Sequence, residues 1–352
     1  MIKPGTDRPL HISITTSTIL KAVGILLVCY LALLIKEILV VIFVALVVAN
    51  AFDPLVDYLG RHKWPRVLSI SLIYVIVLGL VVLMFYFLVP IVIKEATDFA
   101  ASLPYYVSKV SAFLDSLRQT MGQYGLASSF QTNLDNLATT ISGWTTQLIT
   151  AVYGAVNGLF SVFLILVLSF YLVVEENAIK KIVWSVTPAH SQAYVINLVS
   201  RMQLQIGNWF RGQLLLCLAI FLLTLLGLSI LGVKYSLLLA LLAGITEVVP
   251  YLGPFLGAVP AVLIALVQSP NLALVVIVVY VIIQQLENNI LVPQIMKRVA
   301  DINPIVCIIV LMIGYRLAGA VGAAIAIPIT TALSVALRDL LNYKEKKELA
   351  AT

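Results

Sequence analysis

The residues Val249-Pro250-Tyr251-Leu252-Gly253-Pro254 interrupt an apolar run that extends from residue 235 to residue 268. Two prolines and a glycine so close together remove backbone donors and break a helix. At about 1.5 Å per residue, the whole run would also reach well beyond a hydrocarbon layer about 30 Å thick. We therefore predict two short helices that enter a membrane and return to the same side, as a broken re-entrant hairpin.

The composition around this stretch is that of a membrane protein. Of the 352 residues, 61% are apolar and 11% are charged, whereas soluble domains carry about 25% charged residues. The runs that could enter a bilayer are 19–35, 38–52, 67–93, 151–174, 212–231, 235–268, 271–292 and 303–341. These runs predict an all-α, polytopic bundle of about eight membrane segments. The net charge of +6 lies in short segments between the runs, so no nucleic-acid partner is expected.

Lysine and arginine positions predict the orientation, because cytoplasmic loops of membrane proteins are enriched in both. Basic residues lie in 1–21, 61–66, 177–211 and 342–352, whereas the connector 95–148 carries four acidic residues against only Lys109 and Arg118. This pattern predicts cytoplasmic N- and C-termini. The pair Lys297-Arg298 becomes cytoplasmic only if 235–268 returns to its starting side.

The run 303–341 has the same excess length, and its break is predicted at Arg316-Leu317-Ala318-Gly319-Ala320-Val321-Gly322. Each broken hairpin follows one span, 212–231 or 271–292, and the two units enter from opposite faces. Such inverted repeats are typical of transporters, because unwound backbone inside a bilayer is tolerated beside a solute pathway or within buried protein.

Three amphipathic or polar segments lie outside the spans. The connector 95–150 predicts an extracytoplasmic hairpin of two amphipathic helices, which pack on each other within one subunit or form a contact between subunits. The segment 178–205, interrupted at Pro188, predicts an amphipathic helix along the cytoplasmic interface. Lys36 and Glu37 predict the polar tip of a tight hairpin between the first two runs.

Charged groups at membrane depth are the candidate functional residues, because each costs about 2.5–3.5 kcal/mol to insert. Glu247 precedes the first break, Arg316 lies at the second, and Glu287 belongs to a polar cluster inside the span 271–292. Gln284, Glu287 and Asn288 share one helical face. This face could bind a polar solute or exchange a proton. Alternatively, Arg316 forms a structural pair with Glu247 or Glu287. The predicted pathway residues are Glu247, Pro250, Gly253, Pro254, Gln284, Glu287, Asn288, Arg316, Gly319 and Gly322.

Other chemistry has little support in the sequence. The three cysteines lie far apart within apolar runs, and the histidines have no ligand spacing. We find no phosphate-binding glycine loop, nucleophile elbow or metal motif. No catalytic residue, cofactor or enzymatic activity is therefore expected.

Several motifs resemble one family. The stretch Glu247–Pro254 is similar to the E-x-x-P-Y-x-G-P signature of the autoinducer-2 exporter family of bacterial transporters. Asp53–Asp57, Gln285–Asn288, Pro293–Met296 and the Gly319/Gly322/Pro328 pattern also resemble that family, in order along nearly the whole chain. Lys297-Arg298 departs from it, since many members have glycine after the methionine, and leaves the substrate open.

The resemblance implies a multi-pass protein of the bacterial inner membrane that exports small solutes and forms a homo-oligomer, with a pentamer as one option. Its partners would be the lipid bilayer and a small-molecule or ion substrate. Some relatives are described as sodium/proton antiporters, so sodium (or lithium)/proton exchange is one alternative function. A non-transporting membrane scaffold is the other.

The predicted organisation has five parts. Residues 1–94 are N-terminal scaffold spans, 95–150 the outer hairpin, and 151–205 a span with the interfacial helix. Residues 206–341 are the transport unit, and 342–352 are a cytoplasmic tail. An elevator-like motion of the transport unit against the scaffold is the expected mechanism.

Overall fold

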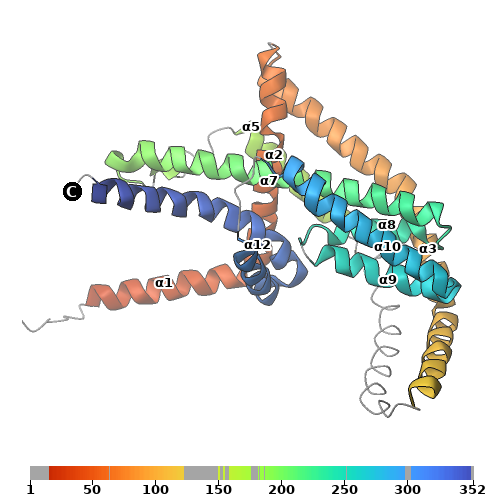
Figure 1. The fold of residues 1–352 in the computed structure, drawn as a ribbon. Helices are drawn as coiled ribbons and strands as arrows, with labels where there is room; N and C mark the ends of the chain where they lie inside the picture. Colours follow the sequence, from red (N-terminus) through yellow and green to blue (C-terminus); the bar gives the residue numbers. More distant parts are fainter. Residues whose placement is uncertain are drawn as a thin grey trace, which may run out of the picture. The chain divides into compact units, whose positions relative to one another are not determined.

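The computed structural model describes residues 16–62, 64–122, 150, 154, 158–175, 181, 183–185, 187–250, 252–297 and 303–349 (Figure 1). Within these ranges there are helices and no strands, which confirms the all-α prediction. In chain order they are α1 (Thr16–Leu34), α2 (Lys36–Arg61), α3 (Arg66–Gly122), α5 (Leu159–Val174), the 3-10 turn Ala189–Ser191, α7 (Gln192–Ile230), α8 (Ser236–Thr246), α9 (Gly253–Gln268), α10 (Pro270–Leu286), the π-helix Glu287–Leu291, α11 (Val292–Ile295) and α12 (Pro304–Leu349). Contacts divide the chain into two units, 1–44 and 45–352.

In the first unit, α1 leads almost directly into α2. Backbone hydrogen bonds of 3.0 Å from Ile35 N to Leu31 O and from Leu39 N to Ile35 O continue the helical pattern through the link. The predicted tight hairpin at Lys36-Glu37 is therefore wrong, because two polar residues without glycine or proline do not interrupt the hydrogen-bond ladder.

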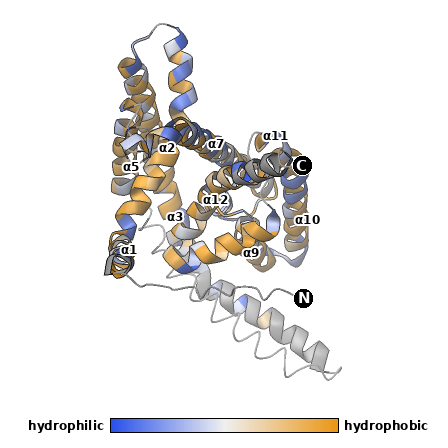
Figure 2. Cartoon of the chain, turned by 90° about the vertical axis from the view of Figure 1, so that its left-hand side faces the viewer, coloured by the Kyte–Doolittle hydropathy of each residue, from blue (hydrophilic) through white to orange (hydrophobic). Residues whose placement is uncertain are grey.

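The helices are too apolar on their outer faces for water. Among the described residues, five helices are long and apolar enough to cross a membrane: Lys36–Arg61, Arg66–Phe99, Ala189–Ile230, Pro270–Ile295 and Pro304–Asp339. Only 6% of the most apolar window of α3 is buried, and hydrophobic residues cover most of α5 and α9 (Figure 2). A helix that is apolar all round belongs in a membrane or a protein core, so the chain is a multi-pass membrane protein.

Two predicted boundaries fall inside continuous helices. α3 runs from Arg66 to Gly122 and so joins the third predicted span to the first helix of the outer connector. α7 begins after Pro188 and the short 3-10 turn, and joins the amphipathic segment 192–205 to the span that follows. The second connector helix, predicted within 130–148, lies outside the described residues.

The first predicted break forms a helical hairpin. α8 and α9 pack against each other and are joined by residues 247–252. A Cβ atom on Gly253 would lie 2.5 Å from Thr246 O, and one on Gly257 would lie 2.8 Å from Ala243 Cβ. The two helices approach this closely because their facing residues are small. Thr246 Oγ1 also donates to Gly253 O at 3.0 Å, across the turn.

The second predicted break also reverses the chain. Within α12, Ala318 has φ −144° and Gly319 has φ +61°, a left-handed conformation that favours glycine. In a straight helix, Gly314 and Gly322 would be separated by about 12 Å, yet a Cβ atom on Gly322 would overlap the Gly314 carbonyl. Cys307 and Ile327 likewise share one hydrophobic cluster. The segment before Gly319 therefore folds back on the segment after it.

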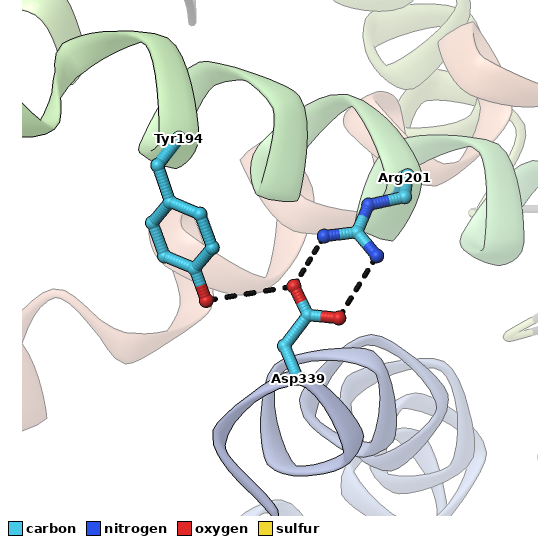
Figure 3. A network of polar contacts seen from close by, with 3 residues as sticks. All are labelled: Tyr194, Arg201 and Asp339. Atoms are coloured by element: carbon cyan, nitrogen blue, oxygen red, sulfur yellow. Dashed lines mark hydrogen bonds and ion pairs between the residues drawn. The ribbon is translucent and has the colours of Figure 1, made fainter. Parts of the chain in front are cut away.

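Three sets of contacts hold the second unit together. A hydrophobic cluster joins Val92, Ala96 and Phe99 of α3 to α7, α8, α9 and α10. Glu95 of α3 accepts a hydrogen bond of 2.8 Å from Leu238 N, in the first turn of α8, where helix N–H groups have no intrahelical partner. On α7, Arg201 pairs with both carboxylate oxygens of Asp339 of α12, and Tyr194 donates to the same carboxylate at 3.5 Å (Figure 3).

Candidate functional site

A cavity of about 610 Å³ lies between α7, the first hairpin, α10–α11 and α12. This volume falls within the range of small-molecule sites. The lining residues are Trp209, Gln213, Leu216, Glu247, Pro250, Pro254, Phe255, Ala258, Val262, Ile277, Tyr280, Val281, Gln284, Glu287, Asn288, Val292, Met296, Cys307 and Ile327. The wall is mainly apolar, and its polar groups gather around the two glutamates.

Glu247 is placed by the first hairpin. It directly follows the last residue of α8, where the proline-containing turn begins, and it is 2% exposed. Gln213 of α7 donates from Nε2 to the backbone carbonyl of Glu247 at 2.6 Å. The amide thereby satisfies a carbonyl at the end of α8, which would otherwise lack a partner, and fixes the start of the turn.

Glu287 is placed by the π-helix. Residues 287–291 form one wide turn between α10 and α11, and Glu287 is 6% exposed. Gln284 Nε2 donates to Glu287 Oε2 at 3.3 Å. On another side of the same helix, Asn289 Nδ2 donates to Gln285 Oε1 at 2.8 Å. The predicted polar cluster therefore divides, and its Gln284/Glu287/Asn288 face lines the cavity. π-Turns within α-helices occur frequently at functional sites.

The structure brings the two glutamates together. Both residues line the same cavity, and their carboxyl groups are close enough for their charges to interact. When Glu247 is ionised, its Oε2 atom has no hydrogen-bond donor among the described residues. Two carboxylates so close repel each other when both are charged, and a shared proton or a bound cation relieves that repulsion. The site can therefore hold a proton or a positive group.

The predicted structural pair with Arg316 is not formed. Arg316 is exposed, and among the described residues no ion pair joins it to either glutamate. Its exposed position at the second break separates it from the buried carboxyl groups.

Gly319 and Gly322 form the second break and do not line the cavity. Gly253 supports the first break by its close packing. Of the predicted pathway residues, the cavity is lined by Glu247, Pro250, Pro254, Gln284, Glu287 and Asn288.

Several lining residues were not predicted from the sequence. Gln213 is a buried amide (3% exposed) inside an apolar helix, and this contrast is a signal that could have identified it. Tyr280 also lines the cavity, and its hydroxyl donates to Gly257 O at 3.2 Å. Trp209, Phe255 and Cys307 resemble any other core residues in the sequence, because only the packing of the first hairpin and α12 around α7 brings them together.

A second cavity, of about 360 Å³, lies near the ends of α2 and α5 and beside α7. Its polar lining includes Asp53, Asp57, Glu175 and Gln203. The hydrogen bond from Lys181 and the charge of that lysine lower the pKa of Glu175.

Within the described part of the chain, no group of three His, Cys, Asp or Glu residues could hold a metal ion.

Long apolar helices, two chain reversals and a cavity with buried carboxyl groups define a multi-pass membrane protein of the transporter class. The chain matches the family described as AI-2E family transporter over residues 19–342. The chain therefore belongs to the AI-2E transporter family, which confirms the resemblance seen in the sequence motifs.

Similar proteins carry transport names. Putative transport protein YrrI of Bacillus subtilis (strain 168) is 30% identical over 316 residues, or 89% of each chain. Putative transport protein YueF of the same organism is 30% identical over 286 residues, covering 79% of this chain and 77% of YueF. AI-2 transport protein TqsA of Escherichia coli (strain K12) is 25% identical over 308 residues, which cover 86% of each chain.

Proposed function

We propose that this chain is a secondary transporter that exports small solutes through the 610 Å³ cavity across the bacterial inner membrane. The observation that supports it most is that Glu247 and Glu287, both buried, line one cavity at a break in one helix and a π-turn in another. Buried carboxyl groups are costly in a membrane protein, and they typically mark pathways for solutes or protons.

The arrangement in the membrane is part of this proposal. α8 and α9 contain 11 and 16 residues, fewer than the roughly 20 residues needed to cross a bilayer. We propose that this hairpin and the one in α12 are re-entrant and form an inverted repeat, within about eight membrane segments. Residues 206–341 would then move, elevator-like, against a scaffold formed by 1–175, with both termini in the cytoplasm and a homo-oligomeric assembly.

Export can be tested with the solute that names one relative. Cells that lack their own AI-2 export activity would express this chain, and AI-2 accumulation in the medium would be measured over time. Expression should increase efflux, and Glu287→Gln should remove most of the increase. Glu37→Gln is the matched control, since Glu37 is an exposed acid outside the cavity. Equal efflux with the wild-type chain and with Glu287→Gln would contradict the assignment of the site.

Cation/proton exchange is the second candidate function, and the carboxyl pair favours it. A site that holds one proton between two glutamates could release it when Na⁺ or Li⁺ binds. In everted vesicles, addition of Na⁺ or Li⁺ should then dissipate a preformed pH gradient. Dissipation that is lost in Glu247→Gln would support exchange, whereas export of AI-2 without any cation-dependent proton movement would exclude it.

The re-entrant arrangement can be tested by cysteine accessibility. Single cysteines at Pro250, Lys297 and Gly319 would be introduced into a chain without its native cysteines. Reagents that do not cross membranes should label Lys297→Cys from the cytoplasm only. Labelling of Lys297→Cys from the periplasm would refute the arrangement, whatever the outcome at the other two positions.

A further inference from the structure

Two residues that line the cavity, Gln213 and Glu247, each carry a buried acceptor atom without a donor among the described residues. Gln213 donates from Nε2 to the Glu247 backbone carbonyl at 2.6 Å, so Oε1 of the same amide has no partner within the described part of the chain. In the ionised Glu247 carboxylate, Oε2 likewise has no donor among the residues that the structure describes. Exchanging the nitrogen and oxygen of Gln213 would not help, because its oxygen would then face a carbonyl oxygen.

These atoms define what a ligand must supply. A buried acceptor without a donor lowers the stability of the protein, so a ligand that presents N–H or O–H groups to Gln213 Oε1 and Glu247 Oε2 recovers that free energy. Both residues are more than nine-tenths buried, at 3% and 2% exposed. A ligand atom at this position is therefore largely shielded from competing water by the protein.

The charge of the site favours a positive ligand group. Glu247 and Glu287 both line the cavity, close enough for their charges to interact, and none of the described lining residues is a lysine, arginine or histidine. A cation between the carboxyl groups would gain hydrogen bonds and relieve their repulsion. The rings of Trp209, Phe255 and Tyr280 also line the cavity, and aromatic faces attract cations.

The remaining wall favours an apolar body attached to that group. Beyond the glutamates it consists largely of hydrophobic side chains, among them Leu216, Val262, Ile277 and Ile327. A bare metal ion would leave this surface uncovered. A molecule that fills about 610 Å³ with an apolar body would bury this surface, which favours binding.

We propose that the cavity selects protonated primary or secondary amines with an apolar body, whose ammonium N–H groups bind Gln213 Oε1 and the Glu247 carboxylate. This inference rests on the proposed transport function, because it names the substrate class of the same site. The charged head lies between the two glutamates, and the apolar body extends along α10 and α12.

A pair of matched fluorescent probes tests the head group. Dansylcadaverine carries a primary ammonium group, and N-pentyl dansylamide has nearly the same shape without it. Binding of each to the purified full-length protein would be measured from the blue shift of dansyl emission, with protein-free micelles as the blank. Dansylcadaverine should bind at least about tenfold more tightly, as expected for hydrogen bonds to a charged group.

Variants locate the binding site. Glu247→Gln should weaken dansylcadaverine binding by about ten- to hundredfold and leave the neutral probe unchanged, and Glu287→Gln should act in the same direction. Glu37→Gln should change neither affinity. Equal affinity of the wild-type protein for both probes would overturn the inference without any variant. A folded Glu247→Gln protein with undiminished selectivity for the ammonium probe would also overturn it.

The same preparation separates this inference from the proposed function. Reconstituted protein that moves AI-2, but binds both probes equally, is a transporter without amine selectivity. Protein that binds dansylcadaverine selectively and also moves it into liposomes supports both. Protein that moves neither solute and binds neither probe contradicts both.

Discussion

The two helical hairpins are alike in the sequence and differ in their chemistry. Residues 247–252 of the first contain a proline and bring Glu247 into the cavity. The second reverses at Ala318-Gly319, and its charged residue, Arg316, is exposed. It contributes Cys307 and Ile327 to the cavity wall. A break in an apolar helix is therefore insufficient to identify a site, because the position of the polar group relative to the reversal decides whether it faces inward.

Both hairpins are closed by small residues. Gly257 meets Ala243 in the first, and Gly314 meets Gly322 in the second. Packing of small residues lets helix backbones approach closely, which is a principal source of helix association in membranes. The second hairpin is the tighter, since two glycine backbones are in direct contact.

The largest expected effect is on the stability of the second hairpin. In Gly322→Ala, the new Cβ atom would overlap the Gly314 carbonyl, and because a backbone atom cannot rotate away, the protein should lose about 3 kcal/mol of stability. Thermal unfolding in detergent, followed by size-exclusion chromatography, would measure the loss. Gly79→Ala in α3 is the control, since nothing lies within 4 Å of its Cβ position. An unchanged unfolding temperature for Gly322→Ala would show that the hairpin is more open.

The next effect concerns the first hairpin and its carboxyl group. Glu247→Gln keeps the size of the side chain and removes its charge, so transport in vesicles should fall by about ten- to hundredfold. The unfolding temperature should stay close to that of the wild-type protein, because the Gln213 bond is to the Glu247 backbone. Normal transport by this variant would remove the functional distinction between the hairpins.

A smaller effect is expected where α3 holds the first hairpin. Glu95→Ala removes the carboxylate that accepts from Leu238 N at 2.8 Å, and loss of such a cap costs about 1 kcal/mol. Hydrogen exchange of the α8 amides would report the change, and exchange should be faster in the first turn of α8 than in α12. Equal acceleration in both hairpins would indicate general destabilisation.

The smallest effect is expected at Arg316. The sequence places this residue in the pathway, whereas the structure places it outside the cavity lining. Arg316→Gln should therefore change transport by no more than about twofold, as is usual for exposed positions. A loss as large as that of Glu247→Gln would restore the arginine to the pathway and make the hairpins functionally equivalent.

The success of the sequence prediction varied with the range of the interactions involved. Proline and glycine act on the local backbone, so both breaks could be located from the residues alone. Helix ends without such residues could not, and α3 and α7 continue through boundaries that were predicted from polarity. The face shared by Gln284 and Glu287 follows from helical spacing, but the placement of Glu287 and Glu247 in one cavity does not, because it depends on how the first hairpin and α10 pack. Gln213 was missed for the same reason.

The π-helix at residues 287–291 has a mechanical consequence. A π-helical turn contains one residue more than the α-helical turns beside it. The position of this extra residue can shift along the helix while the length of the helix stays the same. Each single-residue step rotates the intervening side chains by about 100° around the axis. Glu287 begins the wide turn, so a shift of one residue would swing its carboxylate away from Glu247 while the ends of α10 and α11 stay in place. Such a rotation could open and close the carboxyl pair through a local change of helical register.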